Sequence, residues 1–144
     1  MRLSAKAQYA CVAMVDLACR AGDTKPIQLK HIADKHGISQ RFLVQILLQL
    51  KGAGLVDSTR GATGGYLLAK SPKLISLADI VHAIDQLPPP APSALSGLYS
   101  APLIHVVSEA LQDAQDREQR RLAEITLDEL VRQTHQCSEI SYQI

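Results

Sequence analysis

Side chains able to read DNA bases recur at helical spacing in one short stretch of this 144-residue sequence. Arginine suits the major-groove edge of guanine, glutamine suits adenine, and a valine methyl can meet the methyl of thymine. Side chains of these types lie at Gln40, Arg41, Val44, Gln45 and Gln49. Their pattern favours readout of base edges by one helix. The plainer interpretation is a solvated helix face.

A second group follows where Arg60 precedes a glycine-rich stretch containing Gly61, Gly64 and Gly65. An arginine at a hairpin tip can enter the minor groove, where narrow A·T tracts concentrate negative potential. The glycines would let backbone N–H groups approach phosphates, or would simply permit a positive φ in a turn. A nucleotide-binding phosphate loop is not indicated, because the stretch lacks a Lys-Ser/Thr ending and opens a strand.

Four more residues complete the predicted DNA-binding set. Arg2 and Ser4 lie at the start of the first predicted helix, whose N-terminus would favour contact with a phosphate. Ser39 precedes the helix that carries the base-reading side chains, and Tyr66 follows the glycines. Lys6 lies near the same N-terminus, where it serves equally well as an ordinary surface residue.

Two short helices and a hairpin are needed to position these groups. Apolar residues at 3.6 spacing mark a short helix that ends at Gly37, a position suited to a left-handed cap. Ser39 is a suitable N-cap for the next helix. The predicted buried face of that helix carries Phe42, Leu43, Ile46, Leu47 and Leu50. Strands over residues 55–60 and 66–70 would flank the glycines, so a wing directly follows a helix-turn-helix.

The rest of the sequence predicts further helices around this motif. The first covers residues 4–21, and another begins at Ser76 and stops at the triple proline 88–90. A long helix covers residues 103–124. A capping box starts a last helix at Thr126 that ends near residue 135, and the tail beyond carries no clear signal.

The predicted fold class is therefore mainly α, a winged helix-turn-helix with a β-hairpin wing and a long C-terminal dimerisation helix. Three regions follow from this pattern. Residues 1–87 form the DNA-binding domain, residues 88–102 form a loop rich in Pro, Ser and Ala, and residues 103–144 hold the dimerisation and C-terminal helices.

Charge is distributed unevenly along the chain, although the formal net charge is only +1. Residues 1–70 contain ten Lys or Arg and four Asp, whereas residues 71–144 contain five basic and ten acidic residues. A basic head on an acidic body is typical of a phosphate-binding module joined to an assembly segment. Hydrophobic residues make up 47 % of the chain, which is enough for a core of moderate size.

Several other classes of protein are disfavoured. The three cysteines are too few and too scattered for a disulfide framework, and no apolar stretch is long enough to span a bilayer. The N-terminus lacks the pattern of a signal peptide, so we expect a cytoplasmic protein without a membrane partner. The sequence contains neither a G-x-S-x-G elbow nor an H-E-x-x-H pair, and we expect no enzymatic activity.

The chain resembles the Rrf2 family of bacterial transcriptional regulators over nearly its whole length. The resemblance rests on MRLSAKAQYA from residue 1, Ile32-Ala33 with Gly37-Ile38-Ser39, GLV from residue 54, RG from residue 60, GGYLL from residue 64 and ITLDEL from residue 125. It implies a winged-helix homodimer held by the long helix and bound to an inverted-repeat operator in double-stranded DNA.

The resemblance also bears on cofactors. Cluster-binding members carry three cysteines in the loop before the dimerisation helix, but residues 87–102 contain none, so we expect no iron–sulfur cluster. His105 aligns with a cluster-ligating histidine, and mixed histidine and carboxylate ligation elsewhere in the family leaves His105 and Glu109 as metal candidates. Val44 stands where the iron–sulfur regulator has an acidic residue that discriminates between sites, which implies a different operator preference.

The predicted function is a cluster-free, dimeric transcriptional regulator that senses a small molecule, a thiol change or a partner protein. Two alternatives stay open at this point. One is an iron–sulfur or redox sensor with unusual ligands, and the other is a winged helix that binds protein instead of DNA.

Overall fold

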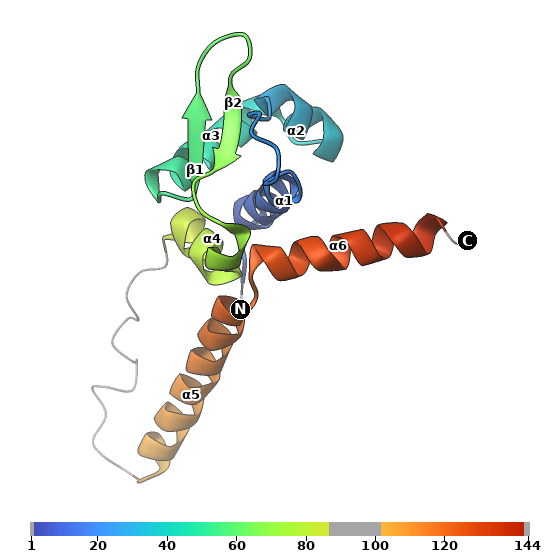
Figure 1. Cartoon of the computed structure of the whole chain (residues 1–144). Coiled ribbons are helices and arrows are strands. Elements are labelled where there is room, and N and C mark those ends of the chain that lie inside the picture. The colour runs from blue at the N-terminus through green and yellow to red at the C-terminus, as the bar shows by residue number, and fades with distance from the viewer. Residues whose placement is uncertain (1, 87–101, 143–144) are drawn as a thin grey trace.

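A computed structural model describes residues 2–86 and 102–142 (Figure 1). The elements in chain order are α1 (Ala5–Cys19), α2 (Leu29–His36), α3 (Gln40–Gly52), β1 (Val56–Thr59), β2 (Gly65–Leu68), the short 3₁₀ helix η1 (Pro72–Leu74), α4 (Leu77–Asp85), α5 (Pro102–Glu124) and α6 (Leu127–Tyr142). The fold is mainly helical with one antiparallel hairpin, as predicted. The expected loop at 88–102 lies outside the described residues, apart from Pro102.

The core is aliphatic and centres on α1. Ala7, Ala10 and Ala13 are fully buried along one face of α1, and these small side chains let neighbouring helices approach closely. The largest fully buried side chains are Met14, Ile32, Leu43, Ile46, Leu47, Leu50, Val56, Ile75, Ile80 and Leu127. Burial of each such side chain stabilises the fold by roughly 1.5–3 kcal/mol before entropy is counted, so α1 to α4 form one packed head.

The hairpin is attached to the head by the linker between α1 and α2. Val56 pairs with Leu68 and Thr59 with Gly65 in the antiparallel register. Ile27 adds a short bridge on the outer side of β2, because its N–H donates to the Tyr66 carbonyl at 3.0 Å and its carbonyl accepts from the Tyr66 N–H at 2.8 Å. The linker between α1 and α2 therefore holds the wing along the outer edge of β2.

Helices α5 and α6 leave the head in two different directions (Figure 1). Backbone hydrogen bonds from Leu77 N–H to the Ile125 carbonyl and from Leu127 N–H to the Ile75 carbonyl, both 2.9 Å, fasten their junction to the start of α4. The first part of α6 packs against α1 and η1, whereas α5 points away from the head. No helix within the described ranges is long and apolar enough to cross a membrane.

The predicted end of the last helix was wrong. Helix α6 continues past residue 135 to Tyr142. Residues 136–142 contain neither Gly nor Pro, so nothing in the chain interrupts the helix there. The hydroxyls of Thr134 and Ser138 also donate to carbonyls four residues earlier, which is compatible with a continuing helix.

Candidate nucleic-acid interface

The turn between α2 and α3 sets the direction of α3. Gly37 has a φ of +65°, the left-handed conformation predicted for it, and the Ile38 N–H donates to the Ala33 carbonyl at 3.0 Å. Ser39 begins α3, because its Oγ accepts a hydrogen bond from the Phe42 N–H at 3.2 Å. Both sequence signals for the helix-turn-helix are therefore confirmed.

The outer face of α3 carries four exposed side chains in one stripe. Arg41, Val44, Gln45 and Leu48 are exposed at i, i+3, i+4 and i+7, while Leu43, Ile46, Leu47 and Leu50 are buried. Leu48 is 58 % exposed and was missed by the sequence reasoning, although its spacing from Arg41 would have revealed it. We name Arg41, Val44, Gln45 and Leu48 the α3 stripe.

The two remaining glutamines differ in their surroundings. Gln40 is exposed in the first turn of α3. Gln49 is half-buried, and its Oε1 is buried without a hydrogen-bond partner among the described residues. The carbonyl end of Gln49 therefore faces protein, whereas Gln40 is accessible beside the α3 stripe.

Glycine is required in the wing for two different structural reasons. Gly61 has a φ of +106°, which glycine adopts without strain. A Cβ at Gly64 would lie 2.4 Å from the Thr59 carbonyl oxygen, and one at Gly65 would lie 2.4 Å from the Ile27 carbonyl oxygen. Gly64 and Gly65 are thus required by close backbone approach, not by a positive φ.

The wing presents Arg60 at its exposed tip. The N–H groups of Gly64 and Gly65 are already used, because they donate to the Gly61 carbonyl at 3.0 Å and to Thr59 Oγ1 at 3.3 Å. Tyr66 packs its half-buried ring against the core and pairs its backbone with Ile27. Among the predicted wing residues, Arg60 and Gly61 are exposed, whereas Tyr66 holds the wing in place.

The N-terminal residues lie at the other end of the head from the wing tip (Figure 1). Ser4 caps α1, because its Oγ accepts from the Ala7 N–H at 3.0 Å. The same hydroxyl donates to the Asp85 carboxylate at the end of α4, and the Ser4 N–H donates to that carboxylate at 3.4 Å. Arg2 is exposed just before this anchor, so Ser4 fixes α1 while Arg2 stays accessible.

A buried ion-pair network holds α2 against α1, and no sequence motif predicted it. The Asp16 side chain is only 2 % exposed, and its two oxygens lie 2.9 Å from Lys35 Nζ and 3.1 Å from His36 Nε2. Burial opposes ionisation of this carboxyl, but the hydrogen bonds from Lys35 and His36 outweigh it and lower the pKa of Asp16. The network fixes the first helix of the helix-turn-helix on the core.

The chain's potential metal donors do not come together among the described residues. No group of three or more His, Cys, Asp or Glu side chains suited to a metal occurs within residues 2–86 and 102–142. His105 and Glu109 form a 3.4 Å pair that is more than 70 % exposed on both sides. Two ligands on one exposed helix face leave most of a coordination sphere without protein donors.

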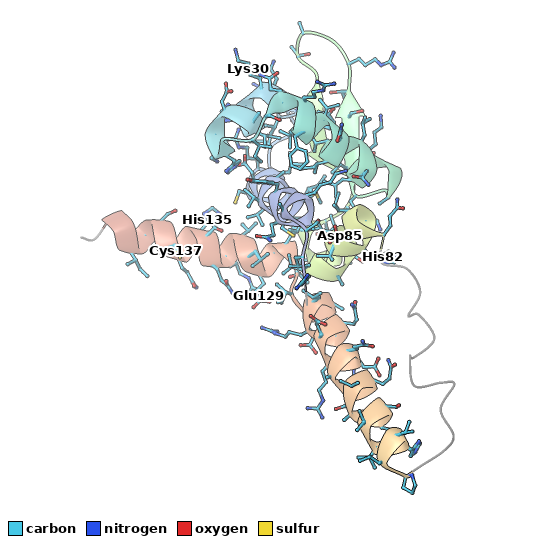
Figure 2. All side chains as sticks on the ribbon, turned by 180° about the vertical axis from the view of Figure 1, so that it is seen from behind. Lys30, His82, Asp85, Glu129, His135 and Cys137 are labelled. Atoms are coloured by element: carbon cyan, nitrogen blue, oxygen red, sulfur yellow. The ribbon has the colours of Figure 1, made fainter. Side chains whose placement is uncertain are left out.

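The cysteines also fail to supply a thiolate set. Burial, with the charge of Asp85, raises the pKa of the Cys11 thiol to about 11, and burial with Asp16 raises the pKa of Cys19. Cys11 and Cys19 are partly buried on α1, and no group of three or more metal-binding side chains includes them within residues 2–86 and 102–142. Cys137 lies out along α6 (Figure 2), and residues 87–101 contain no cysteine. These donors do not fit an iron–sulfur cluster.

Two capped helices followed directly by a hairpin wing define a winged helix-turn-helix, the class of fold that many transcriptional regulators use. The model of the Rrf2 family, described as iron-dependent transcriptional regulators, matches residues 3–133. The chain belongs to the Rrf2 family.

Curated relatives match a little over half of the chain. The HTH-type transcriptional regulator IscR of Klebsiella pneumoniae (strain 342) is 41 % identical over 86 residues, which are 60 % of this chain and 52 % of that protein. IscR of Escherichia coli O1:K1 / APEC is 40 % identical over the same length. The chain thus spans about half the length of these relatives.

Solved structures match nearly the whole chain. T. potens IscR superposes with a TM-score of 0.74 at 32 % identity, covering 93 % of this chain and 88 % of that one. CymR, the global cysteine regulator of B. subtilis, superposes with a TM-score of 0.75 at 30 % identity, covering 91 % and 96 %. The unmatched tenth is too short to contain either C-terminal helix, so the likeness extends into both of them.

Proposed function

We propose that this protein is a transcriptional regulator that binds double-stranded DNA as a homodimer on an inverted-repeat operator. The observation that carries the proposal is the exposed α3 stripe next to a rigidly based wing with Arg60 at its tip. In this arrangement α3 enters the major groove and Arg60 the neighbouring minor groove. The wing's own glycines contribute shape more than phosphate contacts, because two of their N–H groups are already hydrogen-bonded.

The residues of the α3 stripe have polar or apolar roles in this proposal. Arg41 pairs with the acceptors of guanine, and Gln45 pairs with adenine. Val44 and Leu48 offer apolar contacts to thymine methyls. Because two of the four side chains are apolar, the operator should favour thymine at defined positions, and an acidic residue at Val44 should change that preference.

Dimerisation is proposed to use α5. Leu103, Val106, Val107 and Leu111 are between 41 % and 74 % exposed, although they are apolar and lie on the part of α5 that leaves the head. A solvent-surrounded helix with an apolar stripe needs a partner to cover it. Two copies related by a twofold axis would cover each other's stripe and would present two heads to an inverted repeat.

We also propose that the regulator works without an iron–sulfur cluster, responding instead to a small molecule, a thiol change or a protein. The donor set supports this proposal, because no group of three or more metal-binding side chains forms within residues 2–86 and 102–142, and the His105–Glu109 pair is exposed. We expect anaerobically purified protein to show no absorbance band in the visible range. Visible colour that disappears in His105→Ala would contradict the proposal.

The DNA proposal is tested by selecting binding sequences from a pool of random duplexes and measuring affinities for the selected site. We expect an inverted repeat, and we expect Arg41→Ala to lose roughly 1–3 kcal/mol of discrimination at one base pair in each half-site. Arg60→Ala should weaken binding to sites with an A·T tract under the wing. If the wild-type protein enriched no sequence and bound duplex DNA without salt dependence, a protein-binding winged helix would be favoured instead.

The dimer proposal is tested by analytical ultracentrifugation of Leu111→Glu, with Gln112→Glu as a control that adds the same charge at the next position of α5. We expect Leu111→Glu to sediment as a monomer and the control to remain a dimer. Dimers in both variants would remove α5 from the interface.

A further inference from the structure

An open pocket of about 640 Å³ lies beside the wing, outside the α3 stripe. We name it the wing-side pocket. It is formed by the end of α1, the linker to α2, the first turn of α2 and the wing tip. The residues that matter for its chemistry are Arg20, Asp23, Lys25, Gln28, His31 and the wing residue Thr63.

The wing-side pocket carries excess positive charge. Arg20 and Lys25 are basic side chains among its lining residues, and Asp23 is the single carboxylate there. Lys30 adds another cation on the first turn of α2, at the same end of the head as the wing tip (Figure 2). An anion is therefore the class of ligand that this pocket favours.

The charge of Arg20 is not cancelled by the nearby buried carboxylate. Arg20 Nε lies 3.9 Å from Asp16, whose oxygens are already held at 2.9 and 3.1 Å by Lys35 and His36. Arg20 Nη2 instead lies 2.8 Å from His31 Nε2. Because a guanidinium has only donors, the imidazole accepts in this pair, and the remaining guanidinium N–H groups are available to an anion.

The pocket is built into the same body as the wing. The Gln28 side-chain amide donates to the Ala62 carbonyl at 3.4 Å, and the Ile27–Tyr66 bridge joins the linker to β2. A wing that enters a minor groove lies between the two sugar-phosphate strands, which are only about 6 Å apart across that groove. One of these strands must pass the side of the wing where the pocket opens.

We propose that the wing-side pocket receives a backbone phosphate of the bound DNA, with Arg20 and Lys25 as its principal ligands. This inference rests on the proposed function and adds a second row of contacts, on the α2 side of the wing. Phosphate contacts fix position and carry no sequence information. The pocket therefore sets how deeply the wing sits, while the α3 stripe and Arg60 read the bases.

Salt dependence of DNA affinity tests the inference. Lys25→Gln is compared with Lys73→Gln, which removes the same charge from an exposed position on η1, away from the wing. Loss of one phosphate contact lowers the slope of log affinity against log salt by about 0.9. We expect this change in Lys25→Gln and Arg20→Gln, on selected and random duplexes alike, with no change in Lys73→Gln.

Removal of the pocket's carboxylate should act in the opposite direction. Asp23→Asn is expected to raise DNA affinity at low salt by about two- to five-fold, because one exposed charge interaction of this kind is worth up to about 1 kcal/mol. Affinity that is unchanged or reduced in Asp23→Asn would place the DNA strand elsewhere.

The outcomes separate this inference from the proposed function. Wild-type binding to DNA with an unaltered salt slope in both Lys25→Gln and Arg20→Gln would overturn the pocket assignment and leave the regulator intact. Failure of the wild-type protein to bind any duplex would overturn both. A calorimetric titration with inorganic phosphate tests a free anion as ligand. Saturable binding that is lost in Lys25→Gln, together with an unaltered DNA salt slope, would assign the pocket to a free anion and overturn the DNA contact.

Discussion

Substitution of Gly65 by alanine tests how the wing is anchored. A Cβ at this position would lie 2.4 Å from the Ile27 carbonyl oxygen and 2.6 Å from its carbon, about 1 Å inside ordinary contact. The obstacle is backbone, which cannot rotate away like a side chain. Relief of the clash requires separation of the linker from β2 and loss of the two Ile27–Tyr66 hydrogen bonds, at 3.0 and 2.8 Å.

Each of these hydrogen bonds contributes about 1 kcal/mol net, so we expect Gly65→Ala to lower the free energy of unfolding by about 2 kcal/mol. For a chain of this length the melting temperature should fall by roughly 4–8 °C. Thermal unfolding followed by circular dichroism measures the change. DNA affinity should also fall, because Arg60 and the wing-side pocket share this anchor.

Gly22→Ala is the matched control for Gly65→Ala. A Cβ at Gly22 would meet no heavy atom within 4 Å, and its backbone has no positive φ of the kind that favours glycine. We expect its stability to stay within about 0.5 kcal/mol of wild type. If Gly65→Ala had the same melting temperature as this control, the close approach of linker and wing would not constrain the residue at position 65, and the proposed clash would be refuted.

Three further predictions concern the helices. Asp16→Asn should lower the free energy of unfolding by about 2 kcal/mol at pH 7, where the charged hydrogen bonds are formed. Because the pKa of Asp16 is lowered, this difference should persist above pH 4 and shrink as the wild-type carboxyl is protonated at lower pH. Urea unfolding at several pH values measures it. Ser39→Ala should lose about 1 kcal/mol of stability through the missing cap, measured by the same unfolding assay. In a chain with Cys19→Ser and Cys137→Ser, Cys11 should react slowly with a thiol reagent at pH 8 and faster as the pH approaches 11. Equally rapid reaction of Cys11 in the folded and the urea-unfolded chain would contradict its burial.

Local signals in the sequence were sufficient for the helix-turn-helix. Gly37 and Ser39 act within a few residues of themselves, so a left-handed cap and an N-cap could be predicted without any knowledge of the rest of the fold. The same holds for the capping box of α4, in which Ser76 and Asp79 bond each other's backbone N–H groups. These signals are local because the hydrogen bonds they make span three or four residues.

Features that depend on distant segments could not be predicted in this way. Gly65 is required by Ile27, which lies 38 positions earlier, whereas the local sequence offered only phosphate contact or a positive φ as its reason. The Asp16 network joins residues about 20 positions apart, without a motif. Leu48 is a different case, because its helical spacing was visible and its apolar type alone suggested burial.

The junction between α5 and α6 has a mechanical consequence. Two backbone hydrogen bonds fasten this junction to the residues that lead into α4, and the 23 residues of α5 extend from it for about 35 Å. A rotation of about 10° at the junction displaces the far end of α5 by about 6 Å, whereas consecutive base pairs are about 3.4 Å apart. In the proposed dimer, the angle of α5 at this junction thus sets the distance between the two DNA-binding heads. A signal that alters the two hydrogen bonds there would shift the heads out of register with the half-sites of the operator.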